Sequence, residues 1–540
     1  MKRATRISIL GLIVLGALLV VAYGGISAVL SRAATREVNK FLATLPEGQA
    51  SCGDIQFSLL TGTANVNDVR FAYRAELQGD SAKRPGMDVY IGRVEIGHIL
   101  YSLRQGKILT VNSVSVLRPT VELWLDEKHP ETCLPAFMID TNAQPVQLPF
   151  QQAELKKLLI DDASMQLHSV RTSLDVAIDH CSLSMQQLAY DSAFHFNDSV
   201  YSFSLAHAAV TLPDGSMKMQ TRDIAHSNQG EVRIGASRIV HNMDKLELGN
   251  IVQEPVTWID MQLQSVVLSP LNPIRKALKK DFTVQHINAV VSYMDVFRDE
   301  RFKLKHPTVM PQRILMNLPM TFYVKDADVQ MQRIHIGFAI TDTHVGLLDF
   351  SDINAHVAHI TNRSGYTMRL DGSCPMGEGI ANARFDMTMN RECNFRIQLK
   401  AKDINTSFLD GFIRPFAGIS SDCKIDSIYT NYTGNDLRAD GTFRMVYHDF
   451  KMKVNKGDDI PFEIITRHAG SITRIGNAFV PGSNPPTKHA KPRGYQVSWK
   501  RDEMKDVELY LFGPIIDGVK KTFLPGLYVH LRTKDGEIYD

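Results

Sequence analysis

Alternation of apolar and polar residues with a period of two dominates the sequence. This is the period of a β-strand whose side chains point in turn to two faces, one apolar and one wet. Such strands suit an antiparallel-rich sheet that is covered on one side only, so we predict a mainly β chain. The apolar positions of the clearest runs are Ile259, Met261 and Leu263, then Phe385, Met387 and Met389, and finally Phe395, Ile397 and Leu399, which alternate with Arg396, Gln398 and Lys400.

Short polar signals interrupt these runs. The dipeptides Asp214-Gly215, Asp371-Gly372 and Asp440-Gly441 indicate turns between strands. A second signal, a small polar residue or histidine followed by Ala and an alternating run, is interpreted either as a reused strand-entry turn or as ordinary turn chemistry. It occurs at Asp162-Ala163, His207-Ala208, Asn288-Ala289 and Asp326-Ala327. Short helices are expected at 35–45, 99–105, 273–280, 405–416 and 514–523.

The N-terminus has a different pattern. Ile7–Ser31 is a run of 25 residues without a charge. At about 1.5 Å per residue it forms roughly 37 Å of helix, enough to cross a hydrocarbon core of about 30 Å. Lys2, Arg3 and Arg6 precede the run and place this end in the cytoplasm. A cleaved signal peptide is the alternative, because Ala22-Tyr23-Gly24 has small residues at cleavage-site spacing. The length of the run favours an uncleaved transmembrane anchor.

The composition of the chain reduces the number of functional classes to consider. The 540 residues include 60 basic and 58 acidic ones, and three of the basic residues precede the apolar run. The rest of the chain therefore carries 57 basic and 58 acidic residues, a net charge of −1, which does not favour nucleic-acid binding. The sequence contains no nucleotide-binding or hydrolase signature, so we predict no enzymatic activity and no cofactor.

Candidate chemical groups have simpler interpretations. His356 and His359 are expected on opposite faces of a strand, which argues against a metal site. Gly372–Gly379 is glycine-rich but lacks the Lys-Ser/Thr of a phosphate loop, and Asp161-Asp162 is interpreted as a strand-entry turn. Six cysteines without a CxxC pair do not predict zinc binding. Local disulfides between Cys393 and either Cys374 or Cys423 are possible if this part of the chain is exported.

Several short motifs follow one another in an order that resembles the AsmA-like family of bacterial envelope proteins, relatives of TamB. After the apolar run they are Gly62–Val69, Pro85–Val89, Val94–Ile96, Leu100–Arg104, Gly106–Ile108, Val111–Val114 and Arg118–Leu123. Near the other end they are Thr406–Leu409, Arg414–Phe416, Ile425–Ile428 and Asp440–Tyr447. Together these regions cover roughly 200 residues, and the family pattern provides no catalytic residues to transfer.

The resemblance implies a fold and a function. It implies a long, curved, antiparallel-rich sheet that forms an open apolar trough, anchored in the inner membrane by one helix with its bulk in the periplasm. Relatives of this type bind or conduct lipid acyl chains and contribute to phospholipid transport and outer-membrane homeostasis. The implied partners are a phospholipid or other acyl lipid, the inner membrane, and an outer-membrane or envelope protein at the distal end. The alternative function is assembly of outer-membrane proteins through exposed strand edges.

The expected lipid-lining residues are the nine apolar residues of the three clearest runs. A closed sandwich uses the same alternation as an open trough, so the sequence leaves these two architectures open. The C-terminal Pro514–Phe523 is expected to be a helix that begins at Pro514 and either caps the last strands, closes the trough or lies on a membrane. The expected regions are 1–31 (cytoplasmic tip and anchor), 32–50 (juxtamembrane helix), 51–130 (N-terminal AsmA-like region), 131–373 (central trough), 374–479 (C-terminal AsmA-like region) and 480–540 (linker and amphipathic segment).

Overall fold

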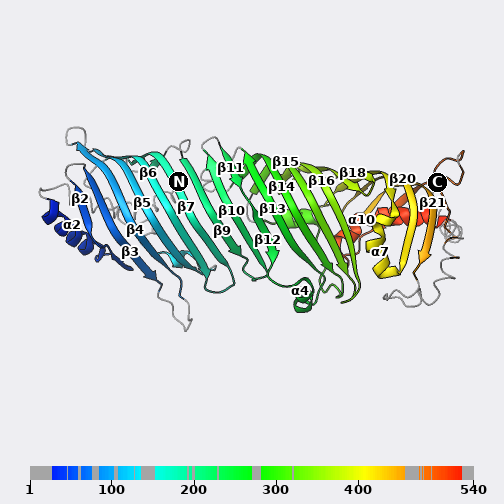
Figure 1. Ribbon diagram of the computed structural model, residues 1–540, viewed down its shortest axis with the longest axis horizontal. Coiled ribbons are helices and arrows are strands. Elements are labelled where there is room, and N and C mark those ends of the chain that lie inside the picture. Colours follow the sequence, from blue (N-terminus) through cyan, green and yellow to red (C-terminus); the bar gives the residue numbers. More distant parts are fainter. Residues whose placement is uncertain are drawn as a thin grey trace. The chain divides into compact units, whose positions relative to one another are not determined.

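The protein is mainly β and divides into two compact units in the computed structural model (Figure 1). One unit is Met1–Asn242 with Asn272–Leu278, and the other is Met243–Leu271 with Lys279–Asp540. The structure describes residues 27–45, 47–58, 62–75, 84–102, 108–126, 128–135, 152–190, 194–196, 201–227, 230–269, 281–318, 321–455, 474, 477, 480–487 and 489–525. The apolar run Ile7–Ser31 lies outside this part except for its last residues, and 273–280 lies wholly outside it.

The first unit is a mixed sheet with a helix at its N-terminal end. Neighbouring strands are antiparallel except for the parallel pair β5–β6. Its helices are α2 (Ser27–Leu42) and the 3₁₀ turn η2 (Pro130–Cys133). Its strands are β1 (Gln49–Ser51), β2 (Ile55–Ser58), β3 (Thr63–Arg74), β4 (Gly86–Ser102), β5 (Ile108–Leu125), β6 (Gln152–Ser169), β7 (Asp175–Tyr190), β8 (Phe194–Phe196), β9 (Tyr201–Thr211), β10 (Met217–Ser227), β11 (Glu231–Ile234) and β12 (Ser237–His241).

The second unit is a mixed sheet of the same kind. Here β14–β15 is the parallel pair, and the strands on both sides of it are antiparallel. Its strands are β13 (Val256–Ser269), β14 (Asp281–Asp299), β15 (Thr321–Ala339), β16 (Val345–Thr361), β17 (Thr367–Met376), β18 (Gly379–Thr388), β19 (Phe395–Asn405), β20 (Ile419–Gly434), β21 (Arg438–Val454) and β22 (Gly494–Lys500). Its helices are α4 (Lys245–Val252), α6 (Pro311–Met316), η3 (Thr406–Leu409), α7 (Asp410–Ala417) and α10 (Val507–Phe523).

Helix α2 covers the apolar side of the first strands. Ala34, Val38 and Leu42 recur at helical spacing and are buried against a core that includes Ile55 and Phe71. The side chain of Asn39 joins the helix to the chain before β2, because its amide donates to the carbonyl of Cys52 at 2.9 Å and its oxygen accepts from the Cys52 amide at 2.8 Å. Among the described residues, no helix has the length and apolar character needed to span a membrane.

The small-polar–Ala signals are not strand-entry turns. All four lie inside strands, and Asp162 interrupts β6 with a φ of 55° between the pairs Ile160↔Leu183 and Ala163↔Cys181. An aspartate tolerates this left-handed backbone because its short side chain bonds locally, which makes it a β-bulge residue. Other bulge-type residues with positive φ inside strands are Asp68, His98, Arg118, His180, Gln187, Asp223, Asp352, His359, Asp403 and Asp449.

These bulges explain why the alternation slips by one residue in the middle of most long strands. In β16 the apolar face passes from Phe350 to Ile353, and the exposed Ser351 and Asp352 lie between them. One bulge residue in β6 also pairs with another in β7, since the Nδ1 atom of His180 lies 2.6 Å from a carboxylate oxygen of Asp162. That carboxylate raises the pKa of His180. Asp161-Asp162 is therefore a bend within a strand.

Several turn and helix predictions also need correction. Asp214-Gly215 lies between β9 and β10, as predicted, but Asp371-Gly372 and Asp440-Gly441 lie inside β17 and β21. A Cβ at Gly441 would overlap Tyr432 on the neighbouring strand, so close packing explains this glycine. Residues 99–102 extend β4, because Ile99 and Leu100 pair with β5. The helical segment 405–416 is confirmed by η3 and α7.

The C-terminal segments are integral to the second sheet. The expected linker 480–494 is fastened to β21 through Asn484, which exchanges backbone hydrogen bonds with Tyr447 at 2.9 and 3.1 Å. Helix α10 begins at Val507, so Pro514 lies inside the helix and does not start it. The predicted Cys393 disulfides are not formed, because all six cysteines are free thiols, and Cys393 and Cys423 lie in separate cores.

Candidate functional surface

A row of apolar residues crosses every strand of the second unit on one face of the sheet. Residues that are paired in register on neighbouring strands project to the same face, so the pairing defines the row directly. We call this set the apolar row, and it consists of Leu268, Ile287, Ala327, Val357, Leu370, Phe385, Ile397, Tyr432, Gly441 and Val497, one residue from each of β13–β22. It contains no charged side chain.

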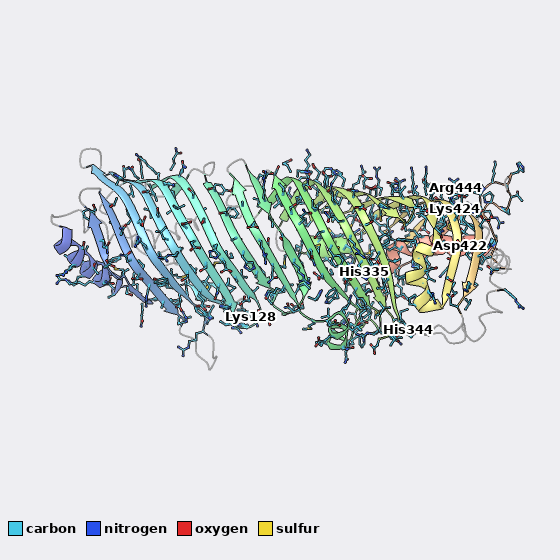
Figure 2. The ribbon with its side chains drawn as sticks, in the orientation of Figure 1. Lys128, His335, His344, Asp422, Lys424 and Arg444 are labelled. Atoms are coloured by element: carbon cyan, nitrogen blue, oxygen red, sulfur yellow. The ribbon has the colours of Figure 1, made fainter. Side chains whose placement is uncertain are left out.

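The next position along most of these strands belongs to the opposite face and is polar throughout. We call this set the polar row, and it consists of Asn288, Asp328, His356, Asp371, Arg384, Gln398, Asn431, Thr442 and Gln496. Side chains outside the row follow the same division, as Lys424 of β20 and Arg444 of β21 are exposed on this face (Figure 2). Along these two rows the sheet therefore separates apolar from polar side chains.

Ion pairs between neighbouring strands stabilise the wet face. A nitrogen of His356 lies 2.8 Å from Asp328, and the guanidinium of Arg384 donates to Asp371 at 2.6 Å. On the same sheet His335 lies 2.8 Å from Asp349 and lowers the pKa of that carboxyl group. These groups satisfy one another across strands, and no set of three or more metal-ligating side chains occurs among the described residues.

The first unit carries an equivalent row. It crosses β3, β4, β5, β6, β7, β9, β10 and β12 through Tyr73, Met87, Leu123, Leu167, Val176, Val210, Met219 and Ile239. Met87 is buried, the residues from Leu123 to Val210 are half-buried, and Met219 is 42 % exposed. Each unit therefore combines one covered stretch of apolar face with one stretch that reaches solvent.

Burial changes sharply along the apolar row of the second unit. Leu268, Ile287, Val357, Leu370 and Phe385 are half-buried, whereas Ala327 of β15 is 3 % exposed. On β19, β20 and β22 the row is buried, since Ile397 is 8 % exposed, Tyr432 1 % and Val497 2 %, and Gly441 of β21 is half-buried. The change occurs between β18 and β19, where helix α10 begins to cover the face.

Helix α10 covers the last strands through a narrow, small-residue side. The ring of Tyr510 meets Phe395 edge-on with centroids 5.7 Å apart, and the hydroxyl of Tyr432 donates to the Leu511 carbonyl at 2.8 Å. Gly513 and Gly518 lie so close to the sheet that a Cβ would overlap Trp499 or Phe443 respectively. The side predicted from the sequence to be apolar, Ile515, Ile516, Val519 and Phe523, is only half-buried.

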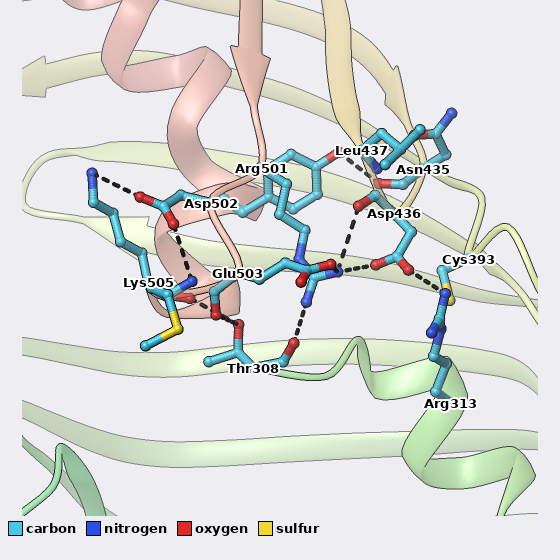
Figure 3. Close-up of polar contacts among 12 residues, drawn as sticks. Thr308, Arg313, Cys393, Asn435, Asp436, Leu437, Arg501, Asp502, Glu503 and Lys505 are labelled. Atoms are coloured by element: carbon cyan, nitrogen blue, oxygen red, sulfur yellow. Dashed lines mark hydrogen bonds and ion pairs between the residues drawn. The ribbon is translucent and has the colours of Figure 1, made fainter. Parts of the chain in front are cut away.

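Charged residues hold the beginning of this helix (Figure 3). The guanidinium of Arg501 is 3 % exposed, pairs with Asp436 in the β20–β21 turn, and donates to the carbonyl of Thr308. Asp436 also binds Arg313 of α6, so one carboxylate joins segments that are more than 100 residues apart. The hydroxyl of Thr308 donates to the carbonyl of Lys505 at 2.8 Å. This polar cluster fixes the chain that leads into α10.

A second cluster lies at the first residue of the helix. Asp506 occupies the N-cap position but makes no cap hydrogen bond, because its carboxylate pairs with Arg298 at the end of β14. Glu300 also accepts from Arg298, at 2.7 Å. Burial, together with a hydrogen bond from Glu300 to Asp506, raises the pKa of Glu300 to about 7. Glu300 therefore changes its charge near neutral pH at the first turn of the helix.

The structure divides the nine predicted lining residues between the two parts of the face. Ile259, Met261 and Leu263 pair with the apolar side of β14 and are half-buried. Met387, Met389, Phe395 and Ile397 are buried, the last two in the core that includes Tyr510 of α10, whereas Phe385 and Leu399 are half-buried. Arg396 and Lys400 are exposed on the opposite face, as the alternation predicts.

Capping of the last strands was one of the roles expected for 514–523, and α10 does pack on these strands, but the sequence interpretation missed the polar residues that hold it. The sequence contains two glycines, Gly513 and Gly518, at the positions where the helix approaches Trp499 and Phe443, but their spacing of five residues did not mark a common side of a helix. No local signal identified Arg501 or Asp436, whose partners are far away in the sequence. Comparisons with models of protein families, with curated proteins and with solved structures gave no match to this chain.

Proposed function

We propose that this protein binds and conducts lipid acyl chains along the apolar faces of its sheets, and that it is not an enzyme. The observation that carries the proposal is the unbroken apolar row of the second unit, which is half-buried from β13 to β18 except at the buried Ala327 of β15. Neighbouring strands are about 4.8 Å apart, so these six strands provide roughly 24 Å of apolar path. One leaflet of a hydrocarbon core is roughly 15 Å deep, so the path accommodates a whole acyl chain.

Lowering the free-energy cost of moving a lipid through water requires no active site. Moving a two-chain lipid through water exposes about 30 methylenes, which costs roughly 25 kcal/mol at about 0.8 kcal/mol each. An apolar strip that covers one side of each chain removes a large part of this cost. The polar row on the opposite face keeps the sheet soluble, and its paired charges do not reach the strip.

The proposed location follows from the N-terminal run. Ile7–Ser31 would anchor the chain once in the inner membrane, with the N-terminus in the cytoplasm and the sheets in the periplasm. The lipid would be a phospholipid or another acyl lipid, and the sheets would act as an open trough rather than as a closed sandwich. A contact with an outer-membrane or other envelope protein would complete a path between membranes.

The test is site-specific photocrosslinking in the full-length chain. We would place p-benzoylphenylalanine at Val357, on the apolar row of β16, and compare it with the same group at His356 on the polar row. In cells labelled with radioactive phosphate, we expect a phospholipid adduct at position 357 and background labelling at 356. Equal labelling at both positions would contradict the proposal. An adduct with a protein and none with lipid would favour the assembly function instead.

A further inference from the structure

We propose that the surface beneath α10 is a second, cryptic acyl-binding surface, and that α10 is a displaceable cover that competes with acyl chains for it. This inference rests on the proposed function, because it extends the same lipid path. The apolar row continues through β19–β22 without a polar interruption. An acyl chain on Phe385 would therefore meet the edge of the helix at Phe395 and Tyr510.

The sequence of α10 makes it a poor helix on its own. Gly513, Pro514 and Gly518 all lie inside its 17 residues, and each lowers helix stability. Pro514 also removes one backbone hydrogen bond, and Asp506 uses its carboxylate on Arg298 rather than on the free amides of the first turn. The helical form of this segment therefore depends on its contact with the sheet.

The same residues make α10 a close-fitting cover. Without a Cβ at Gly513 and Gly518, the backbone approaches the rings of Trp499 and Phe443 directly. The fully buried positions of the helix are Tyr510 and small or polar residues such as Asp517 and Thr522, while Ile515, Val519 and Phe523 pack against the core and stay half-buried. Asp517 accepts from the Ser498 amide at 3.2 Å and pairs with Lys521 at 2.8 Å, which are bonds that water can replace. The cover thus combines a close fit with apolar side chains that are mostly half-buried.

The outer side of α10, which faces away from the sheet, is itself partly apolar. Phe512 is 54 % exposed and Leu509 is 39 % exposed, three residues apart on the helix. A helix whose only role was to close a core would bury such residues. With apolar side chains on its outer side, the helix also presents an apolar surface once it leaves the sheet.

Lipid and helix α10 compete because both would occupy the same surface. An acyl chain and α10 cannot occupy the face of β19–β22 together, so lipid binding there shifts the population toward the displaced helix. The polar clusters around Asp436 and Asp506 lie at the beginning of α10. These clusters act as a hinge and keep the cover attached while its remaining length leaves the sheet.

Hydrogen exchange on the full-length wild-type chain, held in an amphipathic polymer and supplied with phospholipid vesicles, tests displacement. We expect lipid to accelerate exchange of the backbone amides of 507–523 and to slow exchange in β15 and β16. Unchanged exchange in 507–523 at a lipid concentration that saturates the crosslink from Val357 would overturn the cover proposal and leave the proposed function intact. Absence of the Val357 crosslink would instead overturn the proposed function.

A glycine variant tests the hidden surface. Gly518→Val places side-chain atoms into the Phe443 ring and should lift α10, whereas Gly482→Val is the matched control because a Cβ there meets open space. With p-benzoylphenylalanine at Phe395, the lipid adduct should rise about tenfold in Gly518→Val, because a displaced state populated at about 10 % or less becomes dominant. The adduct should not change in Gly482→Val.

The results that would contradict the cover proposal can be distinguished from one another. Background labelling at Phe395 in Gly518→Val, despite rapid exchange in 507–523, would show that the uncovered surface does not bind lipid. If Gly518→Val does not accumulate, the exchange experiment on the wild-type chain decides the proposal. A rise at Arg396 on the polar face equal to that at Phe395 would indicate general unfolding and would overturn the assignment.

Discussion

The apolar face of the second unit has two parts that differ in how deeply their residues are buried. Between β13 and β18 most residues of the row are half-buried, and η3 and α7 pack on another part of the same face through Phe408 and Phe412, whereas between β19 and β22 the row belongs to a packed core under α10. The composition of the two parts is alike, since the row is apolar from Leu268 to Val497. The difference in burial therefore comes from the cover and not from the strands.

This comparison shows that apolar residues in one sheet contribute unequally to stability. A side chain beneath α10 is packed on all sides, so its replacement costs transfer free energy and packing together. A side chain on the half-buried part already contacts solvent, and replacing it costs less stability. Residues whose loss harms function more than stability should therefore lie between β13 and β18.

The largest expected effect is on the covered part. Ile397→Asp buries an unpaired carboxylate under α10 and should lower the free energy of unfolding by about 4 kcal/mol. Val357→Asp, on the half-buried part of the same row, should cost only about 1 kcal/mol. Chemical unfolding of the full-length chain in an amphipathic polymer measures both.

Gln398→Asp on the polar row is the control for Ile397→Asp, and we expect it to stay within about 0.5 kcal/mol of wild type. Lipid crosslinking from Leu370, the next position on the row, should fall in Val357→Asp and persist in Gln398→Asp. Equal destabilisation by the two apolar-row variants would remove the distinction between covered and half-buried parts.

The polar cluster that precedes α10 provides the second prediction. Asp436→Ala leaves the buried guanidinium of Arg501 without its carboxylate partner and should cost about 3 kcal/mol. Asp440→Ala removes an exposed partner of Arg438 and should cost less than about 1 kcal/mol. Thermal unfolding compares the two variants. A loss of no more than about 1 kcal/mol in Asp436→Ala would mean that this cluster does not anchor the cover.

Substitution of a bulge residue on the half-buried part of the face should have a smaller effect on the free energy of unfolding. Asp352 interrupts β16 with a φ of 54°, a conformation that β-branched residues avoid. Asp352→Val should therefore lower the free energy of unfolding by about 1 to 2 kcal/mol, whereas Asp352→Gly should leave it nearly unchanged. Similar stability of the two variants would show that the left-handed backbone at this position carries no cost.

Alternation in the sequence was enough to predict the strands and their two faces, because a period of two follows from the geometry of each strand alone. The pairing of β5 with β6 and of β14 with β15 in parallel was not predictable, since it depends on how distant strands meet. The bulges left a trace, the two consecutive polar residues Ser351-Asp352 between apolar runs, which resembles a turn signal. The turn interpretation failed because Asp serves both turns and left-handed bulge positions.

The candidate surface was only partly predictable for a similar reason. The sequence placed Phe395 and Ile397 on the apolar face correctly, since that depends on neighbours in the same strand. Whether the face is covered depends on α10, which lies more than 100 residues further along the chain. Gly513-Pro514 looked like a helix boundary because a proline usually begins a helix. Contact with Trp499 explains the glycine at this position.

The smallest expected effect concerns pH and the edge of the cover. The pKa of Glu300 is raised to about 7 from 4.5 in the folded chain, so the fold binds this proton more tightly than the unfolded chain does. The resulting stability is fully present below pH 4.5 and is lost as the pH rises through 7. The midpoint of thermal unfolding should therefore fall by a few degrees between pH 5.5 and 8, and exchange in 507–523 should accelerate over the same interval.

Glu300→Gln should flatten that part of the pH dependence, because the amide cannot lose a proton beside Asp506, while the exposed Glu378→Gln should retain the wild-type profile. Histidines with a raised pKa, such as His180, act in the same direction, so only the difference between the two variants isolates Glu300. If the cover opens with rising pH, the lipid adduct from Phe395 should increase from pH 5.5 to 8 in wild type and stay constant in Glu300→Gln. An adduct from Val357 that rises in parallel would show instead that pH acts on lipid delivery and not on α10.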